Sequence, residues 1–179
     1  MKNPYHTDLP IIYLKPAGFY FGDDPTLVST VLGSCVSVIL YNRRLCTGAI
    51  CHALLPTGSC LGAKGFSYVD CSLDRMLERF DELEVKLYEI EVKLFGGADI
   101  LTISKADSRA KTIGQQNIQT ALAIIEARGL HLVSSDVGGS LGRKLYFYTH
   151  TGEVLIKRQK RLRYGPADAP LKLEVESAQ

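Results

Sequence analysis

The sequence has no tryptophan, only two methionines and almost no excess of charge of either sign. Lysine and arginine number 21 and aspartate and glutamate 19, which leaves a formal net charge of +2. So small an excess argues against nucleic acid or an anionic membrane as the main partner, because both attract a clustered basic field. The chain also lacks any apolar run near the roughly 20 residues that a membrane-spanning helix needs. We therefore expect neither nucleic-acid binding nor membrane insertion.

A secretory signal is also missing from the start of the chain, since residues 1–10 are polar and contain no apolar stretch. We therefore expect a cytoplasmic protein. Of the 179 residues, 46% are hydrophobic and 22% are charged, a balance typical of a folded domain rather than a disordered chain. We predict one domain over residues 1–165, in which residues 1–10 form an N-terminal arm. Residues 166–179 are expected to be a C-terminal strand or a loose tail.

The cysteines show neither a disulfide pattern nor a metal-binding pattern. Their number is odd and no secretory signal precedes them, which argues against a disulfide framework. No Cys-x-x-Cys pair is present, although structural zinc sites usually contain such close ligand pairs. We expect Cys46, Cys51 and Cys71 to be buried free thiols. The five positions are Cys35, Cys46, Cys51, Cys60 and Cys71.

Hydrophobic periodicity predicts two helices and about seven or eight strands. The helices are expected at about 70–83 and 114–128, with apolar stripes at Leu73, Met76, Leu77 and Phe80, and at Ile118, Ala121, Leu122 and Ile125. The expected strands are 11–14, 27–32, 36–41, 47–54, 89–95, 130–133, 144–148 and 153–157. Because runs of strands lie between the helices, we predict an α/β fold of α+β character. It would be a layered sandwich of mixed β-sheet flanked by the two main helices.

The segment Gly33-Ser34-Cys35 joins two of these strands and is the first candidate for chemistry. Small residues before a cysteine allow a tight turn whose backbone N–H groups can stabilise an oxyanion near the sulfur. If 36–41 and 47–54 form a hairpin centred between Arg43 and Arg44, the numbers of paired residues sum to 87. Cys35 would then lie opposite His52, with their Cβ atoms about 4.5–5.5 Å apart.

The same register predicts which residues share each face of the hairpin. One face would be apolar throughout, and a slip by one residue would separate the sulfur from the imidazole. That apolar face would carry Val36, Val38, Leu40, Ala49 and Cys51.

A thiol beside an imidazole is the minimal equipment for nucleophilic catalysis on a carbonyl group. The imidazole takes or stabilises the thiol proton, and the thiolate attacks. Ser29 and Thr30, on the preceding strand, are candidates to hydrogen-bond the other ring nitrogen of His52. On the residues alone, the competing interpretation is a buried cysteine beside a hydrogen-bonded histidine.

Several segments, in order along the chain, resemble the CheD family of chemoreceptor glutamine deamidases. The two that carry Cys35 and His52 are Ser-Thr-Val-Leu-Gly-Ser-Cys-Val at 29–36 and Gly-Ala-Ile-Cys-His-Ala-Leu-Leu-Pro at 48–56. The likeness continues at 93–98, 113–117, 136–139, 142–144 and 151–154, so that it spans about 11–157.

This resemblance implies a cysteine hydrolase that converts glutamines of methyl-accepting chemotaxis receptors to glutamates and releases ammonia. It implies the layered fold of deamidase toxins of the cytotoxic necrotizing factor type, with no metal or organic cofactor. Cys35 would be the nucleophile and His52 the base. The family usually has a threonine six residues before the cysteine, a position held here by Ser29 and followed by Thr30, with Gly33 and Ser34 as supporting residues. The receptor's cytoplasmic helices, and in some members a CheC-type phosphatase, would be the partners.

Other functions remain open from the sequence. Residues 157–163 include five basic side chains in seven and would suit a non-catalytic domain that docks a receptor or phosphatase, although an exposed edge strand explains them as well. The same thiol and imidazole would also suit a small-molecule amidase or a methylesterase.

Two further features are expected to be structural. The pairs Gly96–Gly97 and Gly138–Gly139 are interpreted as tight turns near the site, because no phosphate-binding signature follows either. Gln116 and Asn117, at a helix start, are interpreted as packing or capping residues.

Overall fold

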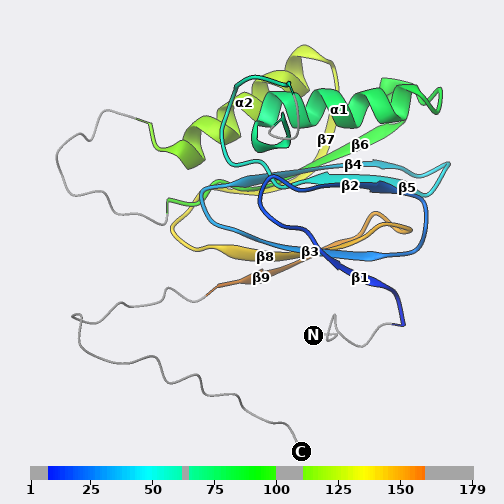
Figure 1. The fold of residues 1–179 in the computed structure, drawn as a ribbon, viewed down its shortest axis with the longest axis horizontal. Coiled ribbons are helices and arrows are strands. Elements are labelled where there is room, and N and C mark those ends of the chain that lie inside the picture. The colour runs from blue at the N-terminus through cyan, green and yellow to red at the C-terminus, as the bar shows by residue number, and fades with distance from the viewer. Residues whose placement is uncertain (1–7, 62–64, 100–110, 160–179) are drawn as a thin grey trace, which may run out of the picture.

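The computed structural model of the chain describes residues 8–61, 65–99 and 111–159, and in these residues it forms three layers (Figure 1). Two helices cover one face of a five-stranded sheet, and a four-stranded sheet covers the other face. The helices are α1 (Val69–Asp81) and α2 (Ile113–Ala127), and the 3-10 turns are η1 (Gly65–Ser67) and η2 (Leu87–Glu89). The strands are β1 (Ile11–Tyr13), β2 (Phe19–Gly22), β3 (Leu27–Leu32), β4 (Val36–Asn42), β5 (Thr47–Cys51), β6 (Ile90–Gly96), β7 (His131–Val137), β8 (Arg143–Tyr148) and β9 (Val154–Arg158).

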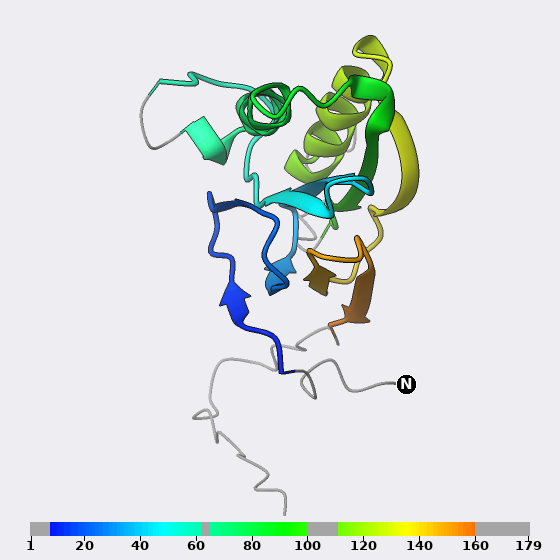
Figure 2. The same cartoon turned by 90° about the vertical axis from the view of Figure 1, so that its right-hand side faces the viewer.

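Both sheets are mixed. The larger has the strand order β2-β5-β4-β6-β7, in which only the β6–β7 pair is parallel. The smaller has the order β1-β3-β8-β9, in which only β1–β3 is parallel. The predicted class, a layered sandwich of mixed sheet with two main helices, is confirmed; both helices lie on the same side of it (Figure 2).

Strand β4 lies in the middle of the larger sheet, and each of its residues is buried. Val36, Val38 and Leu40 pack into the core beneath the helices, whereas Ile39 packs into a second core between the sheets. Because side chains alternate along a strand, a strand that is apolar on both sides needs a covering layer on each. The three-layer arrangement follows from this requirement.

The predicted stripe of α1 is confirmed, since Leu73, Met76, Leu77 and Phe80 are all buried against β4 and its neighbours. The prediction for α2 was wrong at Leu122, which is 39% exposed. The buried stripe of α2 instead contains Gly114, Asn117, Ala121 and Ile125.

The rotation of α2 follows from a close backbone contact at its first turn. A Cβ placed on Gly114 would lie only 2.6 Å from the carbonyl oxygen of Gly97, so this helix face can approach the Gly96–Gly97 turn only because it has no side chain there. Asn117, three residues further on, falls on the same face. The α2 contact therefore determines which helix residue faces the start of β4.

Strand β2 was not predicted. Its Phe-Tyr-Phe-Gly sequence is partly buried at every position and shows no alternation between a buried and an exposed face. It is defined by antiparallel pairing with β5. Within the described part of the chain, no helix is long and apolar enough to cross a membrane.

Gly96 is expected to be the glycine least tolerant of substitution. It has φ of +110°, and a Cβ on it would lie 2.2 Å from the Cys35 carbonyl oxygen. Gly96→Ala should therefore lower the free energy of unfolding by more than the roughly 1–3 kcal/mol expected from backbone strain alone. Gly129→Ala is the control, because Gly129 has φ of +62° with nothing within 4 Å. It should cost only about 1–2 kcal/mol. Urea unfolding measures both, and equal losses would contradict this account.

Candidate active site

Cys35 and His52 lie on either side of one backbone pair that joins β4 to the end of β5. Val36 and Ala53 exchange two backbone hydrogen bonds, of 3.0 and 2.9 Å, in an isolated antiparallel bridge. The numbers of two paired residues therefore add up to 89, as they also do for the pair Ile39 and Ile50. The predicted sum of 87 was wrong by two residues. Cys35 is diagonal to His52 rather than directly opposite it.

The error lies in the hairpin loop, which is longer than predicted. Asn42 pairs with Thr47 and not with Leu45, so the loop contains the four residues 43–46. The Asn42 side chain accepts a hydrogen bond from the Leu45 N–H, and Cys46 adopts a left-handed backbone with φ of 49°. Since the shift is even, the predicted faces are preserved. Val36, Val38, Leu40, Ala49 and Cys51 all lie in the core under the helices, as expected.

The second strand of the hairpin was predicted to reach Leu54, but it ends at Cys51. The reason is that the backbone of His52 pairs with the segment before β2: its N–H donates to the Gly18 carbonyl and its carbonyl accepts from the Ala17 N–H. These two bonds, of 3.0 and 2.9 Å, hold His52 independently of the hairpin.

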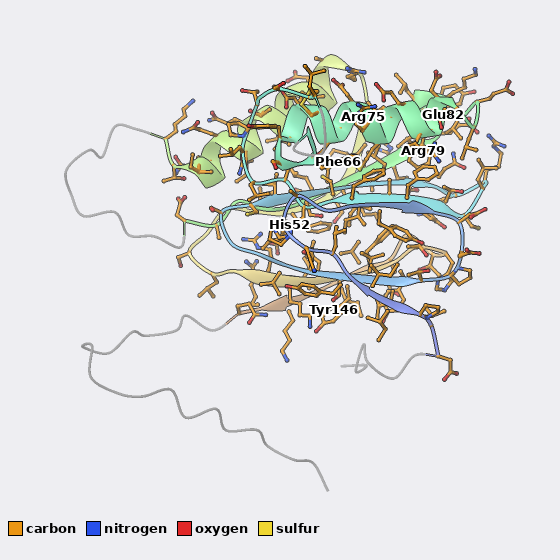
Figure 3. The ribbon with its side chains drawn as sticks, viewed as in Figure 1. His52, Phe66, Arg75, Arg79, Glu82 and Tyr146 are labelled. Carbon is orange, nitrogen blue, oxygen red and sulfur yellow. A yellow bond between two sulfur atoms is a disulfide. The ribbon has the colours of Figure 1, made fainter. Side chains whose placement is uncertain are left out.

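The His52 side chain lies between the two sheets, and the residue is only 3% exposed (Figure 3). Its Nδ1 is 2.8 Å from the hydroxyl oxygen of Thr30, on β3 of the opposite sheet. That hydroxyl donates its single proton to the carbonyl oxygen of Leu14, also at 2.8 Å. It can therefore only accept from His52, which places the ring proton on Nδ1 and leaves Nε2 as the basic nitrogen.

Ser29 lies on the other face of β3. Its neighbours Val28 and Leu32 point into the core between the sheets, and alternation places Thr30 with them and Ser29 away from them. The hydroxyl that holds the His52 ring is thus that of Thr30. Of the two hydroxyl residues that the sequence offered, the structure brings only Thr30 to the imidazole.

Cys35 is half-buried, and its side chain packs at the edge of the core between the sheets. The turn after β6 holds the backbone of Gly33 and Cys35. Their carbonyl oxygens accept hydrogen bonds of 2.8 Å from the N–H groups of Ala98 and Gly97, respectively. Among the described residues, the N–H groups of Ser34 and Cys35 donate to no other backbone group. These two donors are free to stabilise an oxyanion near the sulfur.

Gly96, Gly97, Gly138 and Gly139 all have positive φ, and Gly138 donates a backbone hydrogen bond to Gly96. The two glycine pairs are therefore tight turns packed together behind the cysteine, as expected. Arg143, fully buried, also supports this region through bonds to Asp136 and to the Gly138 carbonyl.

Burial acts on the ionisation of both the Cys35 and the His52 side chain. Burial raises the pKa of the Cys35 thiol, and the hydrogen bond from its own backbone N–H offsets part of that rise. Burial lowers the pKa of His52, with a smaller opposing effect from the Leu14 carbonyl. Within the described residues, no hydrogen bond joins the sulfur to the ring. Both shifts favour the uncharged forms, a thiol and a neutral imidazole, over a thiolate–imidazolium pair.

Two cysteine predictions were wrong. Cys71 is not a free thiol but forms a disulfide with Cys60, which fastens the loop after His52 to α1. The pairing depends on the folded position of that loop, which the spacing of 11 residues does not reveal. Cys46 is exposed because it lies in the hairpin loop, whereas Cys51 is buried as expected.

Known proteins similar to this chain identify its family. The family model described as CheD chemotactic sensory transduction matches residues 54–158. A probable chemoreceptor glutamine deamidase CheD 2 of Geobacter sulfurreducens is 49% identical over 156 residues, covering 87% of this chain and 94% of the relative. A second probable deamidase of this name, from Maridesulfovibrio salexigens, is 43% identical, covering 87% of this chain and 95% of the relative. This chain belongs to the CheD family.

A third relative is less similar. A probable CheD deamidase of Pyrococcus abyssi is 37% identical and covers 76% of this chain and 85% of the relative. Among solved structures, Neisseria meningitidis protein NMB0706, of family-model DUF152, has a TM-score of 0.48 at 12% identity. That match covers 74% of this chain and 65% of the other. The likeness to cytotoxic necrotizing factor toxins stays a prediction.

The raised pKa of Cys35 predicts how this CheD protein reacts with alkylating agents. Because only the thiolate reacts, labelling of Cys35 by iodoacetamide should be slow at pH 7 and rise with a midpoint above the value of about 8.5 for free cysteine. Peptide mass spectrometry across a pH series separates Cys35 from Cys46, and a free cysteine peptide is the reference. A midpoint below that of the reference would instead indicate a thiolate–imidazolium pair.

Proposed function

We propose that this protein is a cysteine hydrolase that converts selected glutamine side chains of chemoreceptors to glutamates and releases ammonia. The observation that carries the proposal is the Thr30–His52 hydrogen bond, which leaves Nε2 as a base on the same side of the hairpin as the half-buried Cys35. The names of the CheD relatives, probable chemoreceptor glutamine deamidases, give the substrate class.

The proposed reaction has two steps. First, His52 Nε2 takes the Cys35 thiol proton, and the sulfur attacks the side-chain amide carbon of the glutamine. The resulting oxyanion accepts hydrogen bonds from the N–H groups of Ser34 and Cys35, and the imidazolium returns the proton to the leaving ammonia. In the second step His52 activates a water molecule, which adds to the thioester; its collapse yields glutamate and restores the thiol.

Thr30 has a defined part in this mechanism. When His52 becomes an imidazolium it carries protons on both nitrogens, and Nδ1 continues to donate to the Thr30 hydroxyl. The same hydrogen bond therefore serves the neutral and the charged ring, which keeps the imidazole in one orientation through the cycle. Because Ser29 lies on the opposite face of β3, we assign the third role to Thr30.

The alternative of a non-catalytic docking domain has less support. Within the described part of the basic segment, Arg158 is paired with Asp136 at 2.7 Å and lies on the edge strand β9. A solvated edge explains such a position. The predicted methylesterase and small-molecule amidase activities use the same acyl-enzyme, so substrate tests must separate them.

Location, partners and domain limits complete the proposal. A substrate on the cytoplasmic helices of a receptor places the enzyme in the cytoplasm, and a CheC-type phosphatase is a second candidate partner. We also retain the proposal of one catalytic domain over 1–165. Residues 1–7 and 160–179, and with them the predicted tail at 166–179, lie outside the described residues.

The nucleophile is tested by mass spectrometry of a receptor cytoplasmic fragment incubated with the enzyme. Wild type should add about 1 Da for each glutamine hydrolysed, whereas Cys35→Ala should add none. His52→Ala should be slower by roughly 10²–10⁴-fold, the range of general acid–base catalysis. Cys46→Ser is the matched control and should equal wild type. Free glutamine is the second substrate, and faster turnover of it than of the receptor would favour a small-molecule amidase.

The two hydroxyl residues are separated by a paired substitution. Thr30→Val keeps the shape of the side chain but loses the hydrogen bond to His52, so deamidation should fall by roughly tenfold or more, below the full effect of losing the base. Ser29→Ala should stay within about twofold of wild type. Initial rates on the same fragment, corrected for folded protein by circular dichroism, provide the measurement. The reverse order of effects would return the third role to Ser29.

A further inference from the structure

The peptide group that precedes Cys35 is held by a side chain. In the turn before β4, the Gly33 and Cys35 carbonyls accept from backbone N–H groups of the turn that follows β6. The Ser34 carbonyl between them accepts a hydrogen bond of 3.1 Å from Nδ2 of Asn117, on α2. Within the described residues, Asn117 is the one side chain that bonds to this turn.

Asn117 also reaches the segment that carries the base. The second proton of the same Nδ2 goes to the Leu54 carbonyl at 2.9 Å, two residues after His52. Both partners are carbonyl oxygens, which can only accept, so the orientation of the carboxamide is determined by its contacts. The residue is fully buried, and its Oδ1 has no hydrogen-bond partner among the described residues. An unpaired buried acceptor lowers the stability of the fold. We therefore infer that this side chain is present for its two N–H donors.

Holding the Ser34 carbonyl also fixes the direction of the next N–H group. In a planar trans peptide, the carbonyl of one residue and the N–H of the next point in opposite directions. With its oxygen turned inward to Asn117, this peptide must aim the Cys35 N–H outward. The backbone N–H of Cys35 favours the thiolate and so lowers the thiol pKa against the effect of burial.

We propose that Asn117 is the positioning residue of the oxyanion hole. It locks the Ser34–Cys35 peptide so that the Cys35 N–H faces the reacting carbonyl, and it ties this turn to the backbone after His52. The inference rests on the proposed deamidase function, because the oxyanion is that of the attacked glutamine. It gives α2 a function beyond covering the sheet, and it adds a positioning role to the packing or capping role expected of Asn117.

Local structure explains how Asn117 reaches this position. Thr112 caps the start of α2, and its hydroxyl accepts from the Gln115 N–H at 3.2 Å. Gly114 then contacts Gly97 backbone to backbone, so the helix start lies directly on the turn that supports Cys35. Asn117 lies one turn further along the same face and points at Ser34 and Leu54.

The test uses Asn117→Leu, which is similar in shape, uncharged and without donors. For this variant, kcat on the receptor fragment should fall by roughly 10- to 10³-fold, up to the effect of losing one oxyanion-hole donor. KM should change by less than about threefold, because the N–H acts on the transition state. The pH midpoint of Cys35 alkylation should move upward, since the sulfur loses a fixed N–H partner.

Two controls separate positioning from folding. Gln116→Ala removes a neighbouring helix side chain that bonds only to the Lys111 carbonyl, and it should leave kcat and the alkylation midpoint unchanged. Ser72→Ala removes a buried hydrogen bond to the Phe66 carbonyl, so it should lower stability without changing the midpoint. If Asn117→Leu does not fold, Asn117→Asp serves instead, since it keeps the shape and offers at most one donor.

The outcomes are distinct. A folded Asn117 variant with wild-type kcat and an unshifted midpoint would overturn the proposal. So would a loss of kcat that merely follows the folded fraction, as in Ser72→Ala. If the wild type does not deamidate the fragment, the proposed function fails. The alkylation midpoint, which needs no substrate, still tests whether Asn117 orients the Cys35 N–H.

Discussion

Strand β4 must be covered on both faces, and this constraint organises the molecule. All seven of its residues are buried, so a helical layer is required on one side and a second sheet on the other. The second sheet supplies Thr30 to the His52 ring, and the helical layer supplies Asn117 to the turn before Cys35. Cys35 lies directly before the first residue of β4 and is half-buried. The same burial that stabilises the sandwich therefore places two supporting residues around the reactive groups.

That burial also sets the chemistry. The raised pKa of the Cys35 thiol and the lowered pKa of His52 both favour the uncharged forms, whereas many cysteine enzymes hold a thiolate at rest. In the proposed mechanism the thiolate forms as His52 accepts the proton, and Thr30 stays hydrogen-bonded to the ring. Fixed backbone donors then meet the oxyanion without reorganisation, which is where most of the rate gain of such sites arises.

Much of the fold could be predicted from the sequence, and the exceptions have physical causes. Period-two and period-3.6 patterns located eight of the nine described strands and both helices, because apolar residues repeat wherever a face is buried. Strand β2 was missed because both of its faces are partly buried and its residues do not alternate, and Leu122 was misplaced because a glycine contact rotates α2. The Cys60–Cys71 disulfide was missed because it depends on where a loop lies. Cys35 and His52 were identified as candidates by local motif and strand face.

By itself, the sequence determined which residue types lie on which face, since side-chain alternation and helix periodicity are local properties of the chain. It thereby placed the thiol and the imidazole on the same side of one hairpin. Only the tertiary structure decided which hydroxyl holds His52, how the hairpin is paired and what Asn117 binds. Each of these depends on contacts between segments far apart in the chain, such as β3 with the residue after β5 or α2 with the turn before β4. Their positions follow from how whole layers pack.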